Sequence, residues 1–390
     1  MTSIPPLAPR SNIEIYRMWE IFKAVNARVK AGGEVINLLV GEPTLPPPRK
    51  ATEAAQAALN KGRNLGYTEA LGMMALREGI AQLYSGRHGL EIPAPRIAAT
   101  IGTSSGFMLA FLAAFSAGDT VAVVEPSYPA YRGALQAVDL VPYRLGTDAS
   151  TGYRVTPAMI DALPAAVKGV VVASPANPTG TMLNATELRA IYDACRRRGL
   201  WLIADELYHG VTYEQPAATV LEAGKDVIVV NGFSKYWGMT GWRIGWLVLP
   251  ERLVPRIEAL SGSLQISAPT LSQIAAIAAL DAEEEMNGRV ALYRRNRDRL
   301  LAALPRLGIQ RFAPPDGAFY LYADIGDFTD DSVAFCRRML DETGVVAAPG
   351  VDFDTANGTR YLRLSFCMDE AVVEKAISRL EPWFAGLNRR

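Results

Sequence analysis

The chain has 390 residues, 49% of them hydrophobic and 21% charged, which is enough for two domains with a large buried core and argues against disorder. Its 40 basic and 40 acidic residues balance, so the sequence offers no electrostatic basis for binding nucleic acid or an anionic membrane. Three widely spaced cysteines form no metal-type pair, and no segment is apolar for long enough to span a bilayer. We therefore expect a cytoplasmic protein with reduced thiols, no metal site and no signal peptide.

The N-terminal part of the sequence predicts a helix, a short strand and a domain crossing. Helical character runs from Ile13 to Lys30 and ends at Gly32-Gly33, and residues 35–40 resemble a strand. Residues 41–48 are rich in proline, which removes backbone donors and excludes regular structure. We interpret this segment as the first crossing between a small and a large domain.

Strand-like runs alternate with amphipathic helical stretches between about residues 50 and 265. Continuous apolar strands separated by helices predict a mostly parallel sheet that is covered on both faces. The predicted strands are residues 98–101, 121–124, 169–172, 201–204 and 227–230.

The C-terminal part begins with a helical pattern from Leu271 to Leu304, which is too long for an ordinary globular helix and is expected to bridge the domains. Strand-like residues 319–322 and 361–366 then predict an α+β domain. The expected organisation is an N-terminal segment with part of the small domain (1–45), a large cofactor-binding domain (46–275), and an interdomain helix with the C-terminal small domain (276–390).

Glycine-rich or polar residues follow several strands, and parallel sheets bind ligands outside the carboxyl ends of their strands. Gly102-Thr103-Ser104 opens a helix, where free N–H groups form either an anion site or an ordinary N-cap loop. Tyr128 follows the next strand and either lies over a flat cofactor or packs in the core.

Asn177 and Asp205 follow two further strands. Asn177 lies in Ser-Pro-Ala-Asn-Pro-Thr-Gly, where the prolines either fix its amide for binding or simply form a tight turn. Asp205 directly follows a buried strand, where a carboxylate is costly unless it has a partner or caps the next helix.

Lys235 is the most informative residue of the chain. It comes shortly after the apolar strand 227–230, and a cation at such a position is expected to be paired or chemically employed. Arg243 follows eight residues later, flanked closely by Gly241 and Gly245. An amine that can form an imine and a guanidinium that can hold a phosphate together indicate pyridoxal phosphate chemistry.

This arrangement resembles the class I/II aminotransferases of fold type I, the aspartate aminotransferase superfamily, over nearly the whole chain. The resemblance rests on the motifs Asn-Pro-Thr-Gly, Asp-x-x-Tyr and Ser-Lys-x7-Arg, which contain Asn177, Asp205, Tyr208, Lys235 and Arg243. It implies an α/β fold with a large seven-stranded, mostly parallel sheet domain and a smaller α+β domain. It also implies ping-pong transfer of an amino group from an L-amino acid to a 2-oxo acid, with pyridoxal 5′-phosphate as a Schiff base on Lys235.

The resemblance also assigns the contacts of the cofactor. Lys235, Asp205 and Tyr208 would be the catalytic residues, and Asp205 would pair with the pyridine nitrogen. Asn177 and Tyr208 would bind the phenolate oxygen. The remaining cofactor contacts would be Gly102, Thr103, Ser104, Tyr128, Ser234 and Arg243, with Tyr67 reaching the phosphate of the neighbouring subunit.

The substrate contacts implied by the resemblance centre on Arg363, because a planar guanidinium matches the α-carboxylate in two parallel bonds. Gly41 and Asn177 would lie beside it. Residues 261–266 lack the arginine that vertebrate-type aspartate aminotransferases use for a distal carboxylate. We therefore expect a neutral donor, aromatic or aliphatic, with Tyr16 of the N-terminal helix in its pocket.

Two other functions share these motifs. A β-eliminating C–S lyase of the same fold would keep the same cofactor residues, and a non-catalytic ligand sensor would keep the fold without the chemistry. No helix-turn-helix domain fits ahead of residue 35, and the lysine is retained, which disfavours the sensor. The implied role of Tyr67 predicts a homodimer with sites at the interface. Residues 349–354 carry aspartate where relatives often have glycine, and the sequence assigns no consequence to it.

Overall fold

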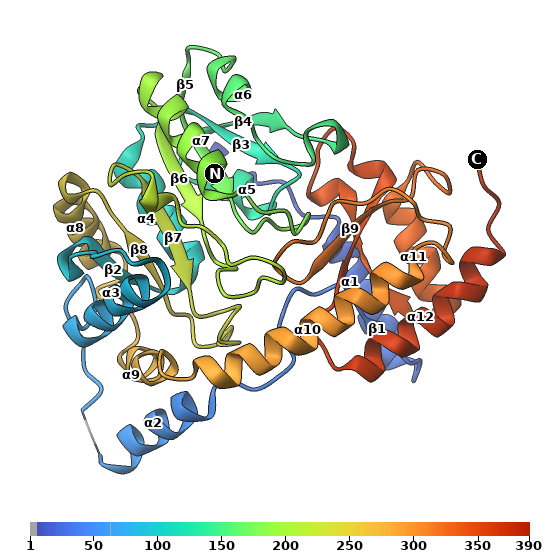
Figure 1. The fold of residues 1–390 in the computed structure, drawn as a ribbon, viewed down its shortest axis with the longest axis horizontal. Helices are drawn as coiled ribbons and strands as arrows, with labels where there is room; N and C mark the ends of the chain where they lie inside the picture. The colour runs from blue at the N-terminus through green and yellow to red at the C-terminus, as the bar shows by residue number, and fades with distance from the viewer. Residues whose placement is uncertain (1–5, 63) are drawn as a thin grey trace, which may run out of the picture.

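A seven-stranded sheet forms the centre of the larger part of the molecule (Figure 1), as the α/β prediction requires. The structure is a computed structural model that describes residues 6–62 and 64–390. All neighbouring strands run parallel except β8, which is antiparallel to both β2 and β7. The strands, in their order across the sheet, are β2 (Ile97–Thr100), β8 (Gly245–Val248), β7 (Ile228–Gly232), β6 (Trp201–Asp205), β5 (Val167–Ala173), β3 (Thr120–Glu125) and β4 (Val141–Gly146).

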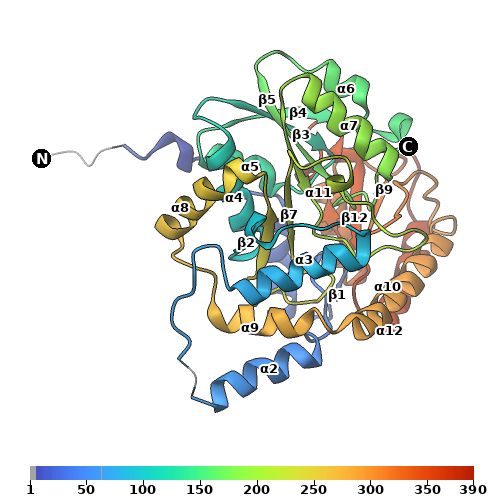
Figure 2. The ribbon, with the colours of Figure 1, turned by 60° about the vertical axis from the view of Figure 1, so that its left-hand side comes forward.

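Helices cover both faces of this sheet because its strands bury apolar side chains in both directions. Val171 belongs to the cluster on one face, whereas its neighbours Val170 and Val172 belong to the cluster on the other. The first face is covered by α4 (Gly102–Ala114), α5 (Ala130–Ala137) and α8 (Val254–Leu264). The second is covered by α3 (Met74–His88), α7 (Ala185–Arg197) and α9 (Thr270–Ala279), with α6 (Pro157–Asp161) against α7 and α2 (Arg49–Asn60) against α9 (Figure 2).

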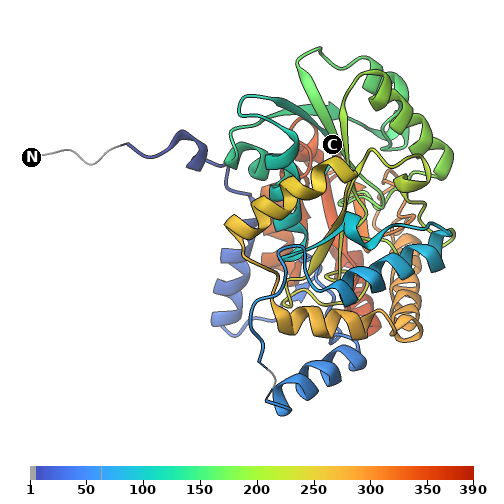
Figure 3. The same cartoon turned by 90° about the vertical axis from the view of Figure 1, so that its left-hand side faces the viewer.

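A second, smaller group of elements lies beside the large sheet. Its antiparallel sheet has β12 (Tyr361–Ser365) between β11 (Ala348–Pro349) and β9 (Tyr320–Asp324), and β1 (Ile36–Asn37) pairs with β10 (Val345–Val346). Its helices are α1 (Met18–Lys30), α11 (Ser332–Thr343) and α12 (Glu370–Ala385), and α10 (Glu283–Ala303) packs against α12. The short turn of helix η1 (Pro9–Ser11) precedes α1 in a segment that projects from the body (Figure 3).

Two predicted helices differ from those in the structure. The helix expected from Leu271 to Leu304 is two helices, α9 and α10, separated at residues 280–282. The three glutamates at 283–285 stand in the first turn of α10, where negative charge favours a new N-terminus. The helix expected from Ile13 begins only at Met18. Within the described ranges, no helix is both long and apolar enough to cross a bilayer.

Candidate active site

The carboxyl ends of the parallel strands face a cavity of about 260 Å³. Its wall is completed by β12 and by the segment after β1, as the fold rule for parallel sheets leads one to expect. Most of the predicted site residues line it together: Gly41, Thr103, Ser104, Tyr128, Asn177, Asp205, Tyr208, Ser234, Lys235, Arg243 and Arg363.

Lys235 lies in the turn that follows β7, and its side chain reaches across the cavity. Its Nζ donates to the carbonyl oxygen of Gly41 at 2.7 Å. Burial lowers the pKa of Lys235 to about 8, because desolvation disfavours the charged ammonium. Roughly a tenth of the amine is therefore neutral at pH 7, far more than for an ordinary lysine, and this fraction is able to act as a nucleophile or base.

Asp205 is the last residue of β6 and is almost completely buried, with 5% of its surface exposed. One carboxylate oxygen accepts the hydroxyl hydrogen of Tyr131, and the other accepts the amide of Leu207 at 3.0 Å. Burial raises the pKa of Asp205 to about 6, and the hydrogen bond from Tyr131 opposes that rise. The carboxylate is therefore held in one orientation, ready for a cationic partner in the cavity.

Arg363 is buried at the centre of β12, and two of its N–H groups are already used by the protein. Nη1 donates to Oδ1 of Asn177 at 2.9 Å, and Nη2 donates to the carbonyl oxygen of Leu39 at 2.6 Å. The guanidinium carbon lies 4.4 Å from the ring centre of Tyr320 and 4.6 Å from that of Phe353. These contacts fix the plane of the fork and leave its remaining donors for a ligand.

Two further contacts order the neighbouring polar groups. The hydroxyl oxygens of Tyr208 and Tyr320 lie 2.7 Å apart in a buried hydrogen bond. A Cβ at Gly41 would lie 2.6 Å from Cζ of Tyr320, so only glycine fits there. Because Oδ1 of Asn177 accepts from Arg363, its amide nitrogen remains free to donate.

The other end of the cavity has the composition of an anion site. Helix α4 begins at Gly102, and no side chain of the described residues caps its N-terminus, so its first N–H groups are available to a ligand. Gly102 has φ +69°, and a Cβ there would lie 2.9 Å from Cζ of Arg243. Arg243 itself has φ 49°, an uncommon value for a residue with a side chain. The hydroxyls of Ser104 and Ser234 stand nearby on the cavity wall.

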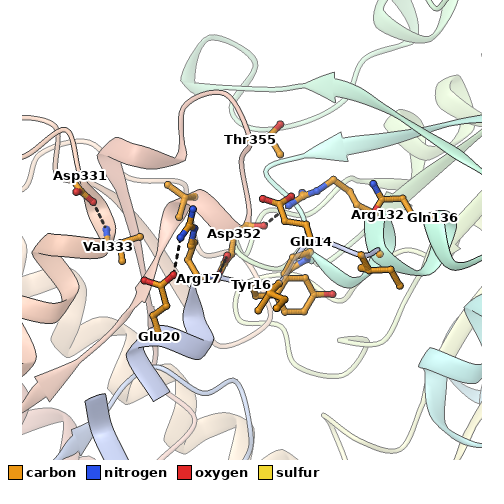
Figure 4. A pocket seen from close by; sticks show the side chains of 15 residues that line it. Glu14, Tyr16, Arg17, Glu20, Arg132, Gln136, Asp331, Val333, Asp352 and Thr355 are labelled. Atoms are coloured by element: carbon orange, nitrogen blue, oxygen red, sulfur yellow. Dashed lines mark hydrogen bonds and ion pairs between the residues drawn. The ribbon is translucent and has the colours of Figure 1, made fainter. Parts of the chain in front are cut away.

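Two predicted residues lie elsewhere in the single chain. Tyr16 precedes α1 instead of lying within it, and lines a separate cavity of about 630 Å³ with Arg17 and Arg132 (Figure 4). It does not line the cavity of Lys235. Tyr67 is 82% exposed, away from its own chain's cavity, which is the placement expected of a residue that serves a neighbouring subunit.

Sequence reasoning missed eight residues that line the cavity: Met18, Phe22, Val40, Tyr131, Ala173, Leu207, Thr240 and Tyr320. The spacing of Met18 and Phe22 places both on one face of α1, which is a signal that the sequence carries. Tyr131 lies in α5, whereas Tyr128 precedes that helix. Tyr320 had no such signal, because it reaches the cavity only through the pairing of β9 with β12.

Comparison with known proteins agrees with this geometry. The family model described as Aminotransferase class I and II matches residues 33–380. The valine–pyruvate aminotransferase of Mycobacterium tuberculosis is 42% identical over 381 residues, which cover 97% of this chain and 98% of that protein. The crystal structure of an aminotransferase from M. tuberculosis has a TM-score of 0.95 at 42% identity, and the match covers 98% of this chain and 100% of that one.

A more distant structure has the same fold. The aspartate aminotransferase of Thermus thermophilus with maleate has a TM-score of 0.91 at 28% identity, over 97% of this chain and 100% of that one. These similar proteins are all named aminotransferases, so neither the lyase nor the sensor alternative finds support among them.

Proposed function

This chain belongs to the class I and II aminotransferases, and on that premise we propose that it moves the amino group of a neutral aliphatic L-amino acid to pyruvate or a similar 2-oxo acid. We propose further that it does so by a ping-pong mechanism with pyridoxal 5′-phosphate held at Lys235. Members of the family depend on this cofactor. The name of the relative from M. tuberculosis, a valine–pyruvate aminotransferase at 42% identity, supports the choice of donor and acceptor.

The chemistry of the cavity wall fits this cofactor at both ends. The free N-terminus of α4 and the guanidinium of Arg243 suit a phosphate. At the other end, the buried carboxylate of Asp205 suits a protonated ring nitrogen, and the amine of Lys235, whose pKa is lowered to about 8, suits an aldehyde. The ring of Tyr128, on the cavity wall, would lie against the flat face of the cofactor.

When bound, pyridoxal phosphate supplies an electron sink that stabilises negative charge at the substrate Cα. Lys235 would accept the proton from that Cα and give it up again later in the same half-reaction. Both proton transfers require an amine with a lowered pKa. Asp205 would keep a proton on the ring nitrogen through a charge-assisted bond. Arg363 would hold the α-carboxylate in its fork and so fix which Cα bond breaks.

The observation that carries the choice of a neutral donor is the number of cations on the cavity wall. Among the described residues that line it, the basic side chains are Lys235, Arg243 and Arg363. Each already has a role, at the amine, the phosphate and the α-carboxylate. No basic group of the described wall is left for a second carboxylate, whereas Met18, Phe22 and other apolar side chains are available for an uncharged substrate.

Half-reactions with single amino acids test this proposal. The holoprotein is mixed with valine, alanine, phenylalanine or aspartate, and conversion of the bound cofactor is followed by its absorbance. We expect valine and alanine to convert it efficiently and aspartate to do so poorly. A kcat/KM that favours aspartate would refute the neutral donor. Release of pyruvate and ammonia from cysteine conjugates, without conversion of the cofactor, would instead favour the lyase.

We also infer a homodimer in the cytoplasm. Apolar side chains are exposed on three segments of the single chain, with exposed fractions of 88% for Leu7, 82% for Tyr67 and 49% for Ile266, and a second copy would cover such surfaces. The cysteines Cys195, Cys336 and Cys367 are buried and unpaired, which suits a reducing compartment.

A further inference from the structure

The segment at residues 349–354, whose aspartates had no assigned consequence, holds the first turn of α1. Asp352 accepts the backbone N–H of Arg17 on Oδ1 and that of Met18 on Oδ2, each at 2.7 Å. The residue that precedes α1, Arg17, makes no side-chain cap of its own. A carboxylate from more than 330 residues away therefore binds the free donors at the helix N-terminus, where negative charge is favoured.

Asp352 is itself fixed by the large sheet. It is 5% exposed, and its carbonyl oxygen accepts Nη2 of Arg132 at 2.8 Å (Figure 4). Nη1 of the same arginine donates to the buried Glu125, also at 2.8 Å. The next residue, Phe353, accepts the amide of Ser127 at 2.9 Å, beside the Tyr128 loop. The aspartate is therefore an anchor that does not move independently of the active site.

Helix α1 in turn supplies an apolar part of the active-site wall. Met18 and Phe22 lie four residues apart, on one face of the helix, and both line the cavity that contains Lys235 and Arg363. If Arg363 holds the α-carboxylate, the donor side chain is the part of the substrate that extends toward the wall. A methyl group offers fewer atoms for such contacts than a branched or aromatic side chain, so this wall would act mainly on the larger donors.

We propose that Asp352 is a positioning residue for the donor side chain: its cap on α1 holds Met18 and Phe22 against the cavity, and so favours valine-sized and larger donors over alanine. The proposal rests on the transamination proposed above. It concerns discrimination between donors and does not concern the bond-breaking step.

Three variants test the cap. Asp352→Ala removes both acceptors. Asp352→Asn keeps the size and one acceptor oxygen, and serves if the alanine variant folds poorly. Asn184→Ala is the matched control, because it removes the side-chain cap of α7, which lies outside the cavity wall. KM and kcat are measured for alanine, valine and phenylalanine, together with the dissociation constant and absorbance of pyridoxal phosphate.

We expect Asp352→Ala to raise KM on the order of tenfold for valine and phenylalanine, with alanine changed by less than about twofold, since apolar pocket contacts discriminate by such factors. The KM values of Asp352→Asn should lie between those of the wild type and Asp352→Ala, and those of Asn184→Ala should match the wild type. Cofactor affinity and spectrum should stay unchanged in all three. An equal loss for alanine and valine, or a loss of cofactor affinity, would overturn the proposal.

Two further measurements separate this proposal from the proposed function. In a Phe22→Ala background, Asp352→Ala should add little to the loss for valine, and full additivity would contradict a shared cause. Hydrogen exchange of the α1 amides should become about tenfold faster in Asp352→Ala, and unchanged exchange would refute the cap. A wild-type chain that transaminates neither alanine nor valine would overturn the proposed function. Hydrogen exchange of the α1 amides would still show whether Asp352 caps that helix.

Discussion

Removing the hydroxyl of Tyr131 should shift the pH dependence of cofactor binding. Its O–H donates to the buried carboxylate of Asp205, whose pKa is raised by burial to about 6. A hydrogen bond to a charged group contributes about 1.5–3 kcal/mol, and one pKa unit corresponds to about 1.4 kcal/mol. In Tyr131→Phe, the carboxyl group of the apoprotein should therefore titrate about one to two units higher.

The assay is the dissociation constant of pyridoxal phosphate for the apoprotein, measured between about pH 5 and pH 9. The ring nitrogen needs the ionised form of Asp205, which exists above its pKa, so wild-type affinity should weaken as the pH falls through about 6. The variant should weaken at a pH that is one to two units higher. Tyr361→Phe is the control, because it removes a buried hydroxyl that bonds Tyr153 at 3.3 Å instead. Identical midpoints in Tyr131→Phe and the wild type would refute the reasoning.

Three further predictions address other residues of the site. Arg363→Lys keeps the positive charge but loses one of the two parallel hydrogen bonds to the substrate α-carboxylate. We expect kcat/KM to fall by about 10- to 150-fold while the absorbance of the bound cofactor persists. An unchanged kcat/KM would contradict the role of Arg363 in binding that carboxylate. The rate at which the apoprotein binds pyridoxal phosphate should rise with pH, with a midpoint near pH 8. Burial lowers the pKa of Lys235 to about 8, and only the neutral amine attacks an aldehyde. A midpoint above pH 10 would indicate an ordinary exposed lysine and contradict the prediction. Light scattering should show a dimer. Tyr67→Phe should weaken cofactor binding while the dimer stays intact, and a fully active monomer would argue against a site shared between subunits.

The sequence predicted five of the seven strands of the large sheet, including the edge strand β2, and missed β4 and β8. Continuous runs of valine and isoleucine, such as 170–172 and 228–230, indicate β5 and β7, because strands buried on both faces need apolar side chains at every position. Strand β4 lies at the sheet edge with Pro142 and Arg144 in it, so its sequence carries no apolar run. Strand β8 directly follows the motif around Arg243 and is only four residues long, so its apolar run is too short to indicate a strand by itself.

The misplaced start of α1 has a different cause. Helix starts are predicted from a capping residue just upstream, but the groups that cap Arg17 and Met18 belong to Asp352. No local pattern contains that contact. The same holds for the hydrogen bond between Tyr131 and Asp205, which lie 74 residues apart in the sequence. It also holds for the aromatic rings beside Arg363, which only tertiary packing brings together.

The motifs around Asn177, Asp205 and Lys235 led to residues that line one cavity, because each places a polar side chain near the end of a buried strand. A carboxylate or an ammonium at the end of an apolar strand requires a partner, and a parallel sheet brings such strand ends to one edge. The sequence could therefore indicate both the residues and their convergence, whereas it could not indicate how each one is oriented.

The most direct test of the whole account is to treat the holoprotein with borohydride, digest it and map the modified peptide by mass. The account predicts a single pyridoxyl group on the ε-amine at position 235, with loss of the visible absorbance. A label on another lysine, or no label at all, would contradict it.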